Sequence, residues 1–577
     1  MVVARAARRS NTAGMSLLIR GAAAVFLAYA ASGCLGSIGG QTSSGGIDEE
    51  NTSKPLPGES SSGETGISFP RLSSAQWKNS ALQLLGLPAS TTVVVPEDPR
   101  LDRFIFDTNF SVAKVAESNL SQFRDVAEQL ATLATQDDAA VNALLPLSTG
   151  VDLKAKMEPA VTSFLLQAFR RPPGAEEVAT YTTLAAAAPG NDEPARVKAG
   201  AKRLAMAVLQ SPKFLYRIEL GELAKVNATP VGGRVSLSGF ELATRVSLAL
   251  FNVAPDAAML AAAKEGKWDA GEPYAQQLNL MLSDPRAKEG LVRFHEQLYA
   301  SERFVQITKN AGAFPTFSPQ MAADMRQDMR LSIADVIDTD GGLQELLTTR
   351  TGYINARLAP VYGLSAAPLS EQIQKTELPA ERAGILSRAG WLAFTAGTLE
   401  RRDVIRGLYV SHNLLCESIQ SPKDPPKTPA EYPANLKTNR QRMEFTTGDA
   451  VCKGCHNMMN PKGYAFERFD ALGVLQSTDN GEPIDSTGSV LIDGKLVNFD
   501  GHQQLMSAIA SSRQGQACYA KHWTSYLLGY DDSTFTESIS KAVADEASSK
   551  HMTVRDVVRT VLKSPAFTTR KISEVAP

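Results

Sequence analysis

Apolar residues recur at three- and four-residue spacing from about residue 68 to the C-terminal end of the chain. This spacing is the period of amphipathic α-helices. Ser73-x-x-Gln76 and Ser238-x-x-Glu241 match the capping box that begins helices. Strand signals gather between about residues 474 and 499, where Asn480-Gly481 and Asp493-Gly494 are typical of hairpin turns. The pattern therefore predicts a mainly α, multi-domain protein of helical modules, with a small β-hairpin region near 474–499.

The chain of 577 residues is too long for one ordinary domain. Pro-rich residues 422–433 indicate an irregular crossing or linker. From the runs of helical periodicity and the breaks between them, we expect helical domains at 68–150, 155–225, 235–365 and 495–577, and a further domain with a cysteine motif at 380–485.

Composition excludes several classes of protein. Lys and Arg number 59 and Asp and Glu number 61, so the net charge is −2 at pH 7. No global basic field exists to hold nucleic acid, and we expect no nucleic-acid partner. Five cysteines in a chain of this length exclude a disulfide-dense scaffold.

The first 34 residues have the features of an export signal. The positive start is supplied by Arg5, Arg8, Arg9 and Arg20, and residues 21–31 form an apolar run too short for a permanent membrane helix. Small residues then precede Cys34, as in the lipobox of bacterial lipoproteins, which predicts that Cys34 carries the lipid. The alternative is an ordinary signal peptide that leaves a soluble secreted protein.

Residues 35–67 are rich in Ser, Gly, Thr and acidic residues and hold almost no large apolar side chains. Such a segment cannot bury a core and is typical of a flexible tether. A tether behind a lipid anchor predicts an exported lipoprotein on a membrane of the bacterial cell envelope, and we expect the outer membrane. Either Met1 or Met15 can be the start of the chain.

The motif Cys452-Lys-Gly-Cys455-His456 carries the clearest chemistry in the sequence. In an exported protein, C-x-x-C-H is the pattern of covalent c-type haem attachment. The two thiols reach the two vinyl groups of one porphyrin, and the histidine lies beneath the iron as an axial ligand. We therefore predict one haem c on Cys452 and Cys455, with His456 on the iron. A local disulfide, a redox pair and a zinc site are the alternatives.

The sequence does not identify the second axial ligand of such an iron. Met458 and Met459 follow His456 too closely to reach the opposite side of the ring. A distal methionine would make an electron carrier of raised potential, whereas an open position would permit chemistry on peroxide or another small ligand. The remaining candidates, each of which is more often a packed residue than a ligand, are Met443, His502, Met506, His522 and Met552.

Cys416 and Cys518 remain after Cys34 and the haem-motif pair are assigned. They lie 102 positions apart, and an oxidising compartment favours their pairing in a disulfide. Two buried free thiols are the alternative.

The run from Cys452 to Gly473 resembles the haem-motif segment of the planctomycete-type exported cytochrome-like proteins, which are built of consecutive domains of unknown function. In this family an aspartate usually stands where this chain has Asn460, a position from which a side chain could orient His456. The resemblance implies helical modules and export over about residues 69–572. It also rests on Phe169-Arg-Arg-Pro172, Gln210-Ser-Pro-Lys-Phe-Leu-Tyr-Arg217, Phe240-Glu-Leu-Ala-Thr-Arg245, Pro255-Asp256, Gly384-Ile-Leu386, Arg406-Gly407, Leu415-Cys416 and Ser564-Pro-Ala-Phe567.

Other charged residues could be functional, but a structural role explains them more simply. Glu467 and Asp470 are three apart and would share a helix face, as a catalytic carboxylate pair could, but a capping or ion-pairing role is favoured. Arg170-Arg171 and Arg401-Arg402 are interpreted as structural ion-pair donors in the same way.

Residues 208–217 and 561–570 agree at six of ten positions, and both contain Ser-Pro-x-Phe after an apolar run. A duplicated binding unit could explain the repeat. The favoured interpretation is one helix-ending device used twice, because Ser-Pro ends a helix and the following Phe can fold back onto the core.

These observations predict an exported lipoprotein with one c-type haem that transfers electrons at the cell envelope. Its expected partners are a redox protein or a small electron donor, and the membrane through its lipid. A redox protein is favoured over an enzyme with turnover, for which no catalytic residue is assigned. The alternatives are a surface-binding or interaction lipoprotein whose Cys452 and Cys455 are structural, and a peroxidase-like haem enzyme.

Overall fold

A computed structural model describes residues 69–98, 105–108, 117–221, 234–419, 431–529 and 533–571. The predicted signal peptide, the lipid-bearing Cys34 and the tether all lie outside these residues, as does most of the Pro-rich linker. None of the described helices is both long and apolar enough to cross a membrane.

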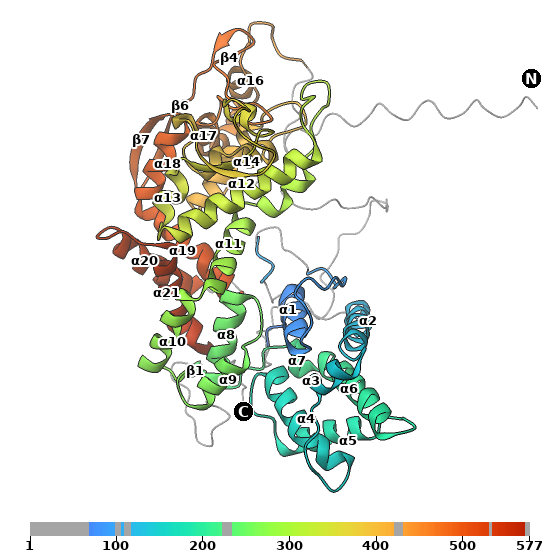
Figure 1. Ribbon diagram of the computed structural model, residues 1–577. Coiled ribbons are helices and arrows are strands. Elements are labelled where there is room, and N and C mark those ends of the chain that lie inside the picture. The colour runs from blue at the N-terminus through green and yellow to red at the C-terminus, as the bar shows by residue number, and fades with distance from the viewer. Residues whose placement is uncertain are drawn as a thin grey trace, which may run out of the picture.

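The described chain is mainly helical, and its helices gather around two hydrophobic cores (Figure 1). The first core is built almost entirely from residues 72–215, so the helices on either side of residue 150 share it. Its elements are α1 Ser74–Leu84, α2 Glu117–Leu133, α3 Asp138–Leu144, α4 Leu153–Phe169, α5 Ala175–Ala186, α6 Glu193–Leu209 and α7 Pro212–Leu215.

The second core is larger and takes in residues from Leu237 to Phe567 together with Phe106. Between residues 239 and 394 the chain forms the helices α8 Gly239–Phe251, α9 Ala257–Lys264, α10 Glu272–Ser283, α11 Pro285–Leu298, η2 Ser301–Gln306, α12 Pro319–Asp338, α13 Leu343–Thr348, η3 Ala359–Tyr362, η4 Ala380–Arg382, η5 Ile385–Ser387 and α14 Ala389–Phe394. From residue 403 onward the chain forms the helices α15 Asp403–Tyr409, η6 Val410–Leu414, α16 Asn439–Thr446, α17 Ala450–Tyr464, α18 Gly501–Ser511, α19 Arg513–Leu528, α20 Ser533–Ala547, α21 Val554–Lys563 and α22 Pro565–Thr568. Of these, α16 and α17 contribute no residue to the second core.

Two antiparallel hairpins occupy the region in which the sequence predicts strands. β4 Thr478–Asp479 pairs with β5 Glu482–Pro483, and β6 Thr487–Ile492 pairs with β7 Lys495–Asp500. Each turn contains a residue in the left-handed backbone region, Asn480 with a φ of 48° and Asp493 with a φ of 53°. Asn-Gly and Asp-Gly accept these positive φ values, which is why they mark such turns. The mainly α fold with a small hairpin region is confirmed.

Two further pairs of antiparallel strands join segments whose pairing was not predicted from the sequence. β2 Thr351–Ile354 pairs with β3 Gln374–Glu377. β1 Arg234–Ser236 pairs with β8 Thr569–Lys571, so the strand at the start of the second core lies beside the last described residues.

The two Ser-Pro segments adopt the same local structure. α6 ends just before Ser211, and α21 ends just before Ser564; each serine precedes a short new helix that begins with proline. The side chains of Phe214 and Phe567 are both buried in a core. This geometry agrees with a helix-ending packing device.

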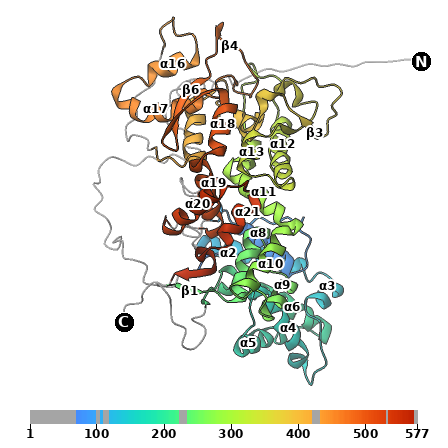
Figure 2. The same ribbon diagram turned by 90° about the vertical axis from the view of Figure 1, so that its left-hand side faces the viewer.

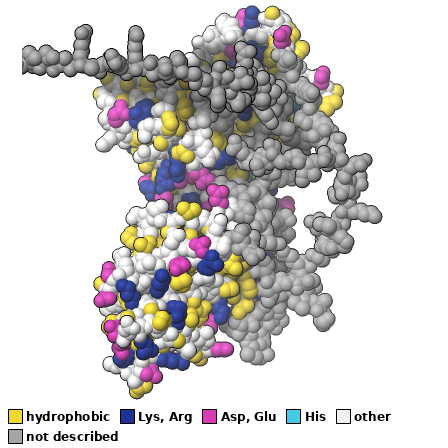
Figure 3. All heavy atoms as spheres, turned by 90° about the vertical axis from the view of Figure 1, so that its right-hand side faces the viewer, with side chains coloured by type: hydrophobic (Ala, Val, Ile, Leu, Met, Phe, Trp, Pro, Cys, Tyr) yellow, Lys and Arg dark blue, Asp and Glu magenta, His cyan; other side chains and the backbone are white. Residues whose placement is uncertain are grey.

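α16, α17, β6, β7 and α18 lie together at one end of the molecule, far from α4 and α5, as Figures 1 and 2 both show. On the face drawn in Figure 3, Lys and Arg side chains are interspersed with Asp and Glu. No charge of one sign dominates the described part of that face.

Candidate functional site

The cysteine motif occupies the first two turns of α17. Cys452, Cys455 and His456 stand at relative positions i, i+3 and i+4, so their side chains share one side of the helix. All three are half-buried, and neither cysteine is in a disulfide. The helix thus presents two thiols and one imidazole together.

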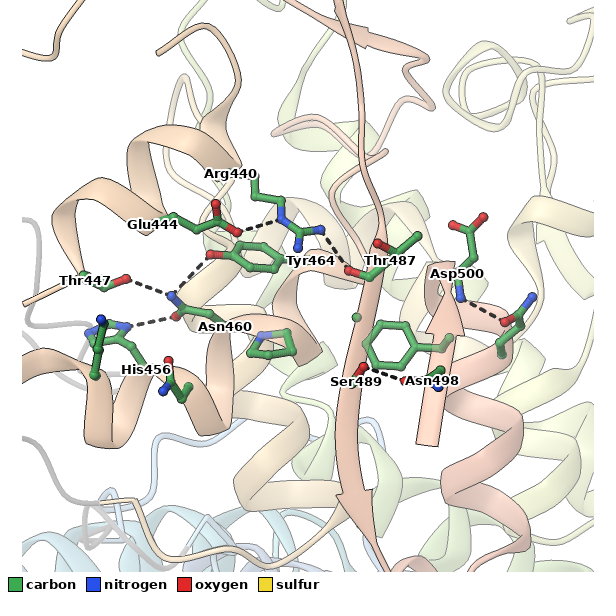
Figure 4. A pocket seen from close by; sticks show the side chains of 17 residues that line it. Arg440, Glu444, Thr447, His456, Asn460, Tyr464, Thr487, Ser489, Asn498 and Asp500 are labelled. Carbon is green, nitrogen blue, oxygen red and sulfur yellow. Dashed lines mark hydrogen bonds and ion pairs between the residues drawn. The ribbon is translucent and has the colours of Figure 1, made fainter. Parts of the chain in front are cut away.

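An amide fixes the orientation of His456. The Nδ1 atom of His456 lies 2.9 Å from Oδ1 of Asn460, one helical turn further on. The Nδ2 group of Asn460 donates to Oγ1 of Thr447 at 3.1 Å and to the hydroxyl of Tyr464 at 3.4 Å (Figure 4). Because the amide NH₂ has these two acceptors, its oxygen is left for His456, and Nδ1 must be the protonated ring nitrogen.

In the neutral ring of His456, the second ring nitrogen is therefore the one with a lone pair. Nε2 makes no hydrogen bond to any residue of the described part of the chain. A neutral imidazole whose Nδ1–H is held by an oxygen acceptor and whose Nε2 is open is the usual state of a metal-ligating histidine. The spacing of His456, Asn460 and Tyr464 at four-residue intervals is the sequence signal for this arrangement. His456 and Asn460 were predicted to interact from the sequence, whereas Tyr464 and Thr447 were not.

The second half of α17 is packed tightly and anchors the exposed first half. α15 crosses α17 with glycines at the contact: a Cβ added at Gly407 would lie 2.0 Å from the Met459 carbonyl oxygen, and one at Gly463 would lie 2.0 Å from that of Asp403. Lys462 is buried and forms an ion pair with Glu417 at 2.6 Å. The motif therefore lies in the exposed first half of α17, and the packing of the second half holds the helix in place.

A cleft of about 820 Å³ opens beside His456. One wall comes from α16 and α17 and the other from β6, β7 and the start of α18 (Figure 4). The guanidinium of Arg440 lies 4.5 Å from the centre of the Tyr464 ring on the first wall. Most of the residues that line the cleft have polar side chains; the lining residues are Arg440, Glu444, Thr447, Gly448, Lys453, His456, Asn457, Asn460, Pro461, Tyr464, Thr487, Gly488, Ser489, Asn498, Phe499, Asp500 and Gln504.

Apolar side chains are exposed around the motif. Val451 is 79% exposed, Phe445 on α16 is 53% exposed and Met458 is 44% exposed. These side chains are available to pack against a ligand held by the motif.

The candidates for a second axial ligand lie elsewhere. His502 is buried, with its Nε2 3.2 Å from the Ala383 carbonyl oxygen and its ring stacked on Phe466, and burial lowers its pKa to about 3. Met506 and Met552 are buried in the second core, and His522 lies beside a disulfide. Met443 is half-buried on α16. None of the five lines the cleft.

Glu467 and Asp470 do not form a carboxylate pair. Oδ1 of Asp470 accepts hydrogen bonds from the backbone N–H groups of Leu472 and Val474, both at 2.8 Å, and so caps a turn. Oε1 of Glu467 accepts from Arg401 at 2.9 Å. Both acidic residues therefore have the structural roles that the sequence analysis favoured.

Glu467 instead has Asp403 as its carboxyl neighbour. Burial, and secondarily the negative charge of Asp403, hold the pKa of Glu467 well above its usual range. The neighbouring carboxyl was not visible in the sequence, because Asp403 is 64 positions away.

The arginine pairs are structural as well. Arg170 donates to the carbonyl oxygens of Ala168, Lys213, Phe214 and Tyr216. Its neighbour Arg171 forms an ion pair with Glu177 at 2.8 Å.

Arg401 bridges Glu467 and Asp479, at 2.9 and 2.6 Å. Arg402 occupies the position just before α15. Neither arginine lines the cleft beside His456.

Cys416 and Cys518 are joined in a disulfide, with their Cα atoms 5.4 Å apart. The bridge links the end of η6 to α19. The sequence left this pairing open against two free thiols.

Family models match four consecutive parts of the chain, each described as a protein of unknown function: PSD3 (DUF1587) at 71–136, PSD5 (DUF1595) at 156–219, PSD4 (DUF1592) at 237–364 and PSCyt3 (DUF1588) at 382–479. The PSCyt3 match contains the cysteine motif. No curated protein and no solved structure matches the chain.

Proposed function

We propose that this chain, which carries PSD3, PSD5, PSD4 and PSCyt3 domains in that order, is an exported protein with one c-type haem that transfers electrons at the cell envelope. One observation carries the proposal: two unbridged thiols and an oriented imidazole share one side of the exposed half of α17. The name of the PSCyt3 family, which points to cytochromes, supports it.

The residues present fit the attachment of a haem. Cys452 and Cys455 would hold it through thioether bonds, and Nε2 of His456 would ligate the iron. When bound, the haem supplies a one-electron couple whose potential depends on its axial ligands and burial. Asn460 keeps the proton on Nδ1 of His456, and the exposed Val451, Met458 and Phe445 offer apolar surface near the ring.

The rest of the proposal concerns location and partners. A lipid on Cys34 would tie the chain to a membrane of the cell envelope, with residues 35–67 as its tether. A redox protein or a small electron donor would then exchange electrons with the haem domain.

A pyridine haemochrome spectrum of denatured, solvent-extracted protein tests the proposal. The chain is made in a host with cytochrome c maturation, because only thioether-linked haem survives denaturation and extraction. We expect about one c-type haem per chain in the wild type and none in Cys452→Ala/Cys455→Ala. His551→Ala, which changes an exposed histidine outside the site, is the matched control and should keep its haem.

A wild-type spectrum without a c-type band would contradict the proposal. Cys452 and Cys455 would then be a structural or metal-binding pair. The interaction lipoprotein would become the leading interpretation, and the helical body would be searched for partners.

A second candidate is a haem enzyme of peroxidase type or a haem protein that binds a small ligand. The cleft beside His456 favours it, because its lining contains neither a methionine nor another histidine. Carbon monoxide added to the reduced protein, or cyanide added to the oxidised protein, separates the two. A rapid spectral change supports the open site, whereas a six-coordinate spectrum that resists both ligands supports the electron carrier.

The Asn460→Asp variant tests the role assigned to Asn460. A carboxylate on Nδ1–H makes the imidazole a stronger donor and stabilises the oxidised iron. We therefore expect a midpoint potential lower than that of the wild type by tens of mV, since about 59 mV corresponds to a tenfold change for a one-electron couple. Redox titration measures the shift; Asn457→Asp, which adds the same charge on the cleft-lining side of α17, is the control for a through-space effect.

A further inference from the structure

A second cluster of metal-binding side chains lies away from the cysteine motif. Cys518 and His522 are one helical turn apart on α19, so their side chains share a face of that helix. Cys416 follows η6, a π-helical turn, and its sulfur is bonded to that of Cys518. The donor atoms of the three residues all lie within 4.8 Å of one another.

The imidazole is aimed at both sulfurs. Nε2 of His522 lies 3.6 Å from Sγ of Cys518 and 3.8 Å from Sγ of Cys416. A tetrahedral zinc ion with bonds of about 2.3 Å to sulfur and about 2.0 Å to nitrogen separates these atoms by about 3.5 Å. The nitrogen therefore already stands at the distance from each sulfur that shared coordination requires.

The other side of the His522 ring is tied to the backbone. The ring hydrogen-bonds to the backbone of Asn413, in the last turn of η6, and this bond favours the protonated ring. Because Nε2 faces the sulfurs, the backbone carbonyl must accept from Nδ1–H, which leaves the Nε2 lone pair directed at the disulfide.

This arrangement has no evident use in the oxidised state. The sulfurs of a disulfide carry no hydrogen, so they cannot donate to the Nε2 lone pair. A ligating histidine, in contrast, commonly donates its other N–H to a backbone carbonyl while the free nitrogen faces the ion.

We propose that Cys416, Cys518 and His522 form a site for a zinc-like divalent cation that becomes available when the disulfide is reduced. A dithiol reductant gives two electrons and two protons to the S–S bond, which breaks into two thiols while the reductant becomes a disulfide. The cation then replaces both thiol protons, which leave to solvent, and binds two thiolates and Nε2. Water reaches the fourth position past Cys416 and His522, both of which are half-buried.

The site is independent of the proposed haem. A Cys452→Ser/Cys455→Ser background removes the other thiol pair, and the full chain in this background is compared oxidised and after reduction with a phosphine under anaerobic conditions. Zn²⁺ is titrated against a chromophoric chelator. Co²⁺ is used as a spectroscopic probe, because thiolate ligation gives an intense charge-transfer absorption.

We expect one Zn²⁺ per reduced chain, none per oxidised chain, and a rise in the Tm of the reduced chain only. His522→Ala should weaken Zn²⁺ binding at least tenfold. His551→Ala, a change at an exposed histidine, should bind as the background does.

Equal Zn²⁺ binding by the oxidised and reduced chains would overturn the proposal, as would unchanged binding in His522→Ala. Circular dichroism of the oxidised variant checks that it folds. His522→Gln replaces it if it does not, and the Co²⁺ spectrum of the background chain reports thiolate ligation without any change at His522.

Discussion

Buried charges hold the residues behind the cysteine motif in place. Arg406 is completely buried, and its guanidinium donates to the carbonyl oxygens of Leu392, Phe466, Phe469 and Asp470. Burial lowers the pKa of Arg406 to about 10, so the side chain keeps its charge at neutral pH. Arg406 thereby ties the segment that follows α17 to α14 and α15.

Glu467 predicts a pH dependence of stability. Its pKa is raised by burial in the folded chain, so between its unfolded pKa of about 4.3 and the higher folded pKa the folded state binds more protons. The contribution of Glu467 to the free energy of unfolding must therefore fall as pH rises through this window, with a slope of up to about 1.4 kcal/mol per pH unit. We expect Glu467→Gln to lose this slope and to gain stability over the wild type as pH rises.

Urea unfolding of both proteins from pH 5 to pH 8 measures the difference. Glu444→Gln is the matched control, because Glu444 forms an exposed ion pair with Arg440 that contributes little. Parallel curves for the wild type and Glu467→Gln would mean that the buried carboxyl is ionised.

At the scale of elements, the crossing of α15 and α17 determines where the motif stands. Gly407 and Gly463 allow the two backbones to touch, because any side chain at either position would overlap a carbonyl oxygen of the other helix. The Ser-Pro-x-Phe segments also position side chains through the ends of elements. In each segment a helix stops at the Ser-Pro pair, and the phenylalanine that follows, Phe214 or Phe567, is buried in a core.

Gly463→Ala should destabilise the fold by about 2–3 kcal/mol, because the added methyl group forces α15 and α17 apart. Gly454→Ala on the same helix is the matched control: nothing lies within 4 Å of its Cβ position, and alanine favours the helix by up to about 1 kcal/mol. Urea unfolding of the two variants compares them. A similar stability for both would show that the crossing has room to spare.

At the scale of the molecule, long-range contacts join parts that the sequence keeps far apart. α1 docks on the end of α8, where Gln83 donates to the Ala254 carbonyl oxygen at 3.0 Å. The buried pair of Glu219 and Arg245, at 2.7 Å, lies where β1 meets β8, and Arg245 also donates to the Phe567 carbonyl oxygen. The first core, the start of the second core and the C-terminal segment are therefore connected.

The disulfide between Cys416 and Cys518 closes a covalent loop with a sequence separation of 102. In the loop-entropy model, such a loop contributes about 4–5 kcal/mol by restricting the unfolded chain. We expect Cys416→Ala/Cys518→Ala to lose stability of this order under oxidising conditions, measured by urea unfolding. Under reducing conditions the wild type and the variant should converge, and a gap that persists there would assign the effect to packing of the cysteines.

The helical class, the two hairpin turns and the cysteine motif could all be predicted from local sequence. Each depends on residues within a few positions of one another: apolar spacing sets the buried side of a helix, Asn480-Gly481 and Asp493-Gly494 accept positive φ, and His456 follows Cys455 directly. Local hydrogen bonds and local sterics suffice for all three, so they can be read without knowing the fold.

The surroundings of the cysteine motif could not be predicted in this way, because they depend on contacts between distant segments. The bond from Asn460 to Thr447, the approach of Asp403 to Glu467, the cleft beside His456 and the position of His522 at the disulfide all join different elements. Such contacts depend on how helices cross and on which distant segments close a loop. Those choices follow from the packing of the whole core, to which any one stretch of sequence contributes only a part.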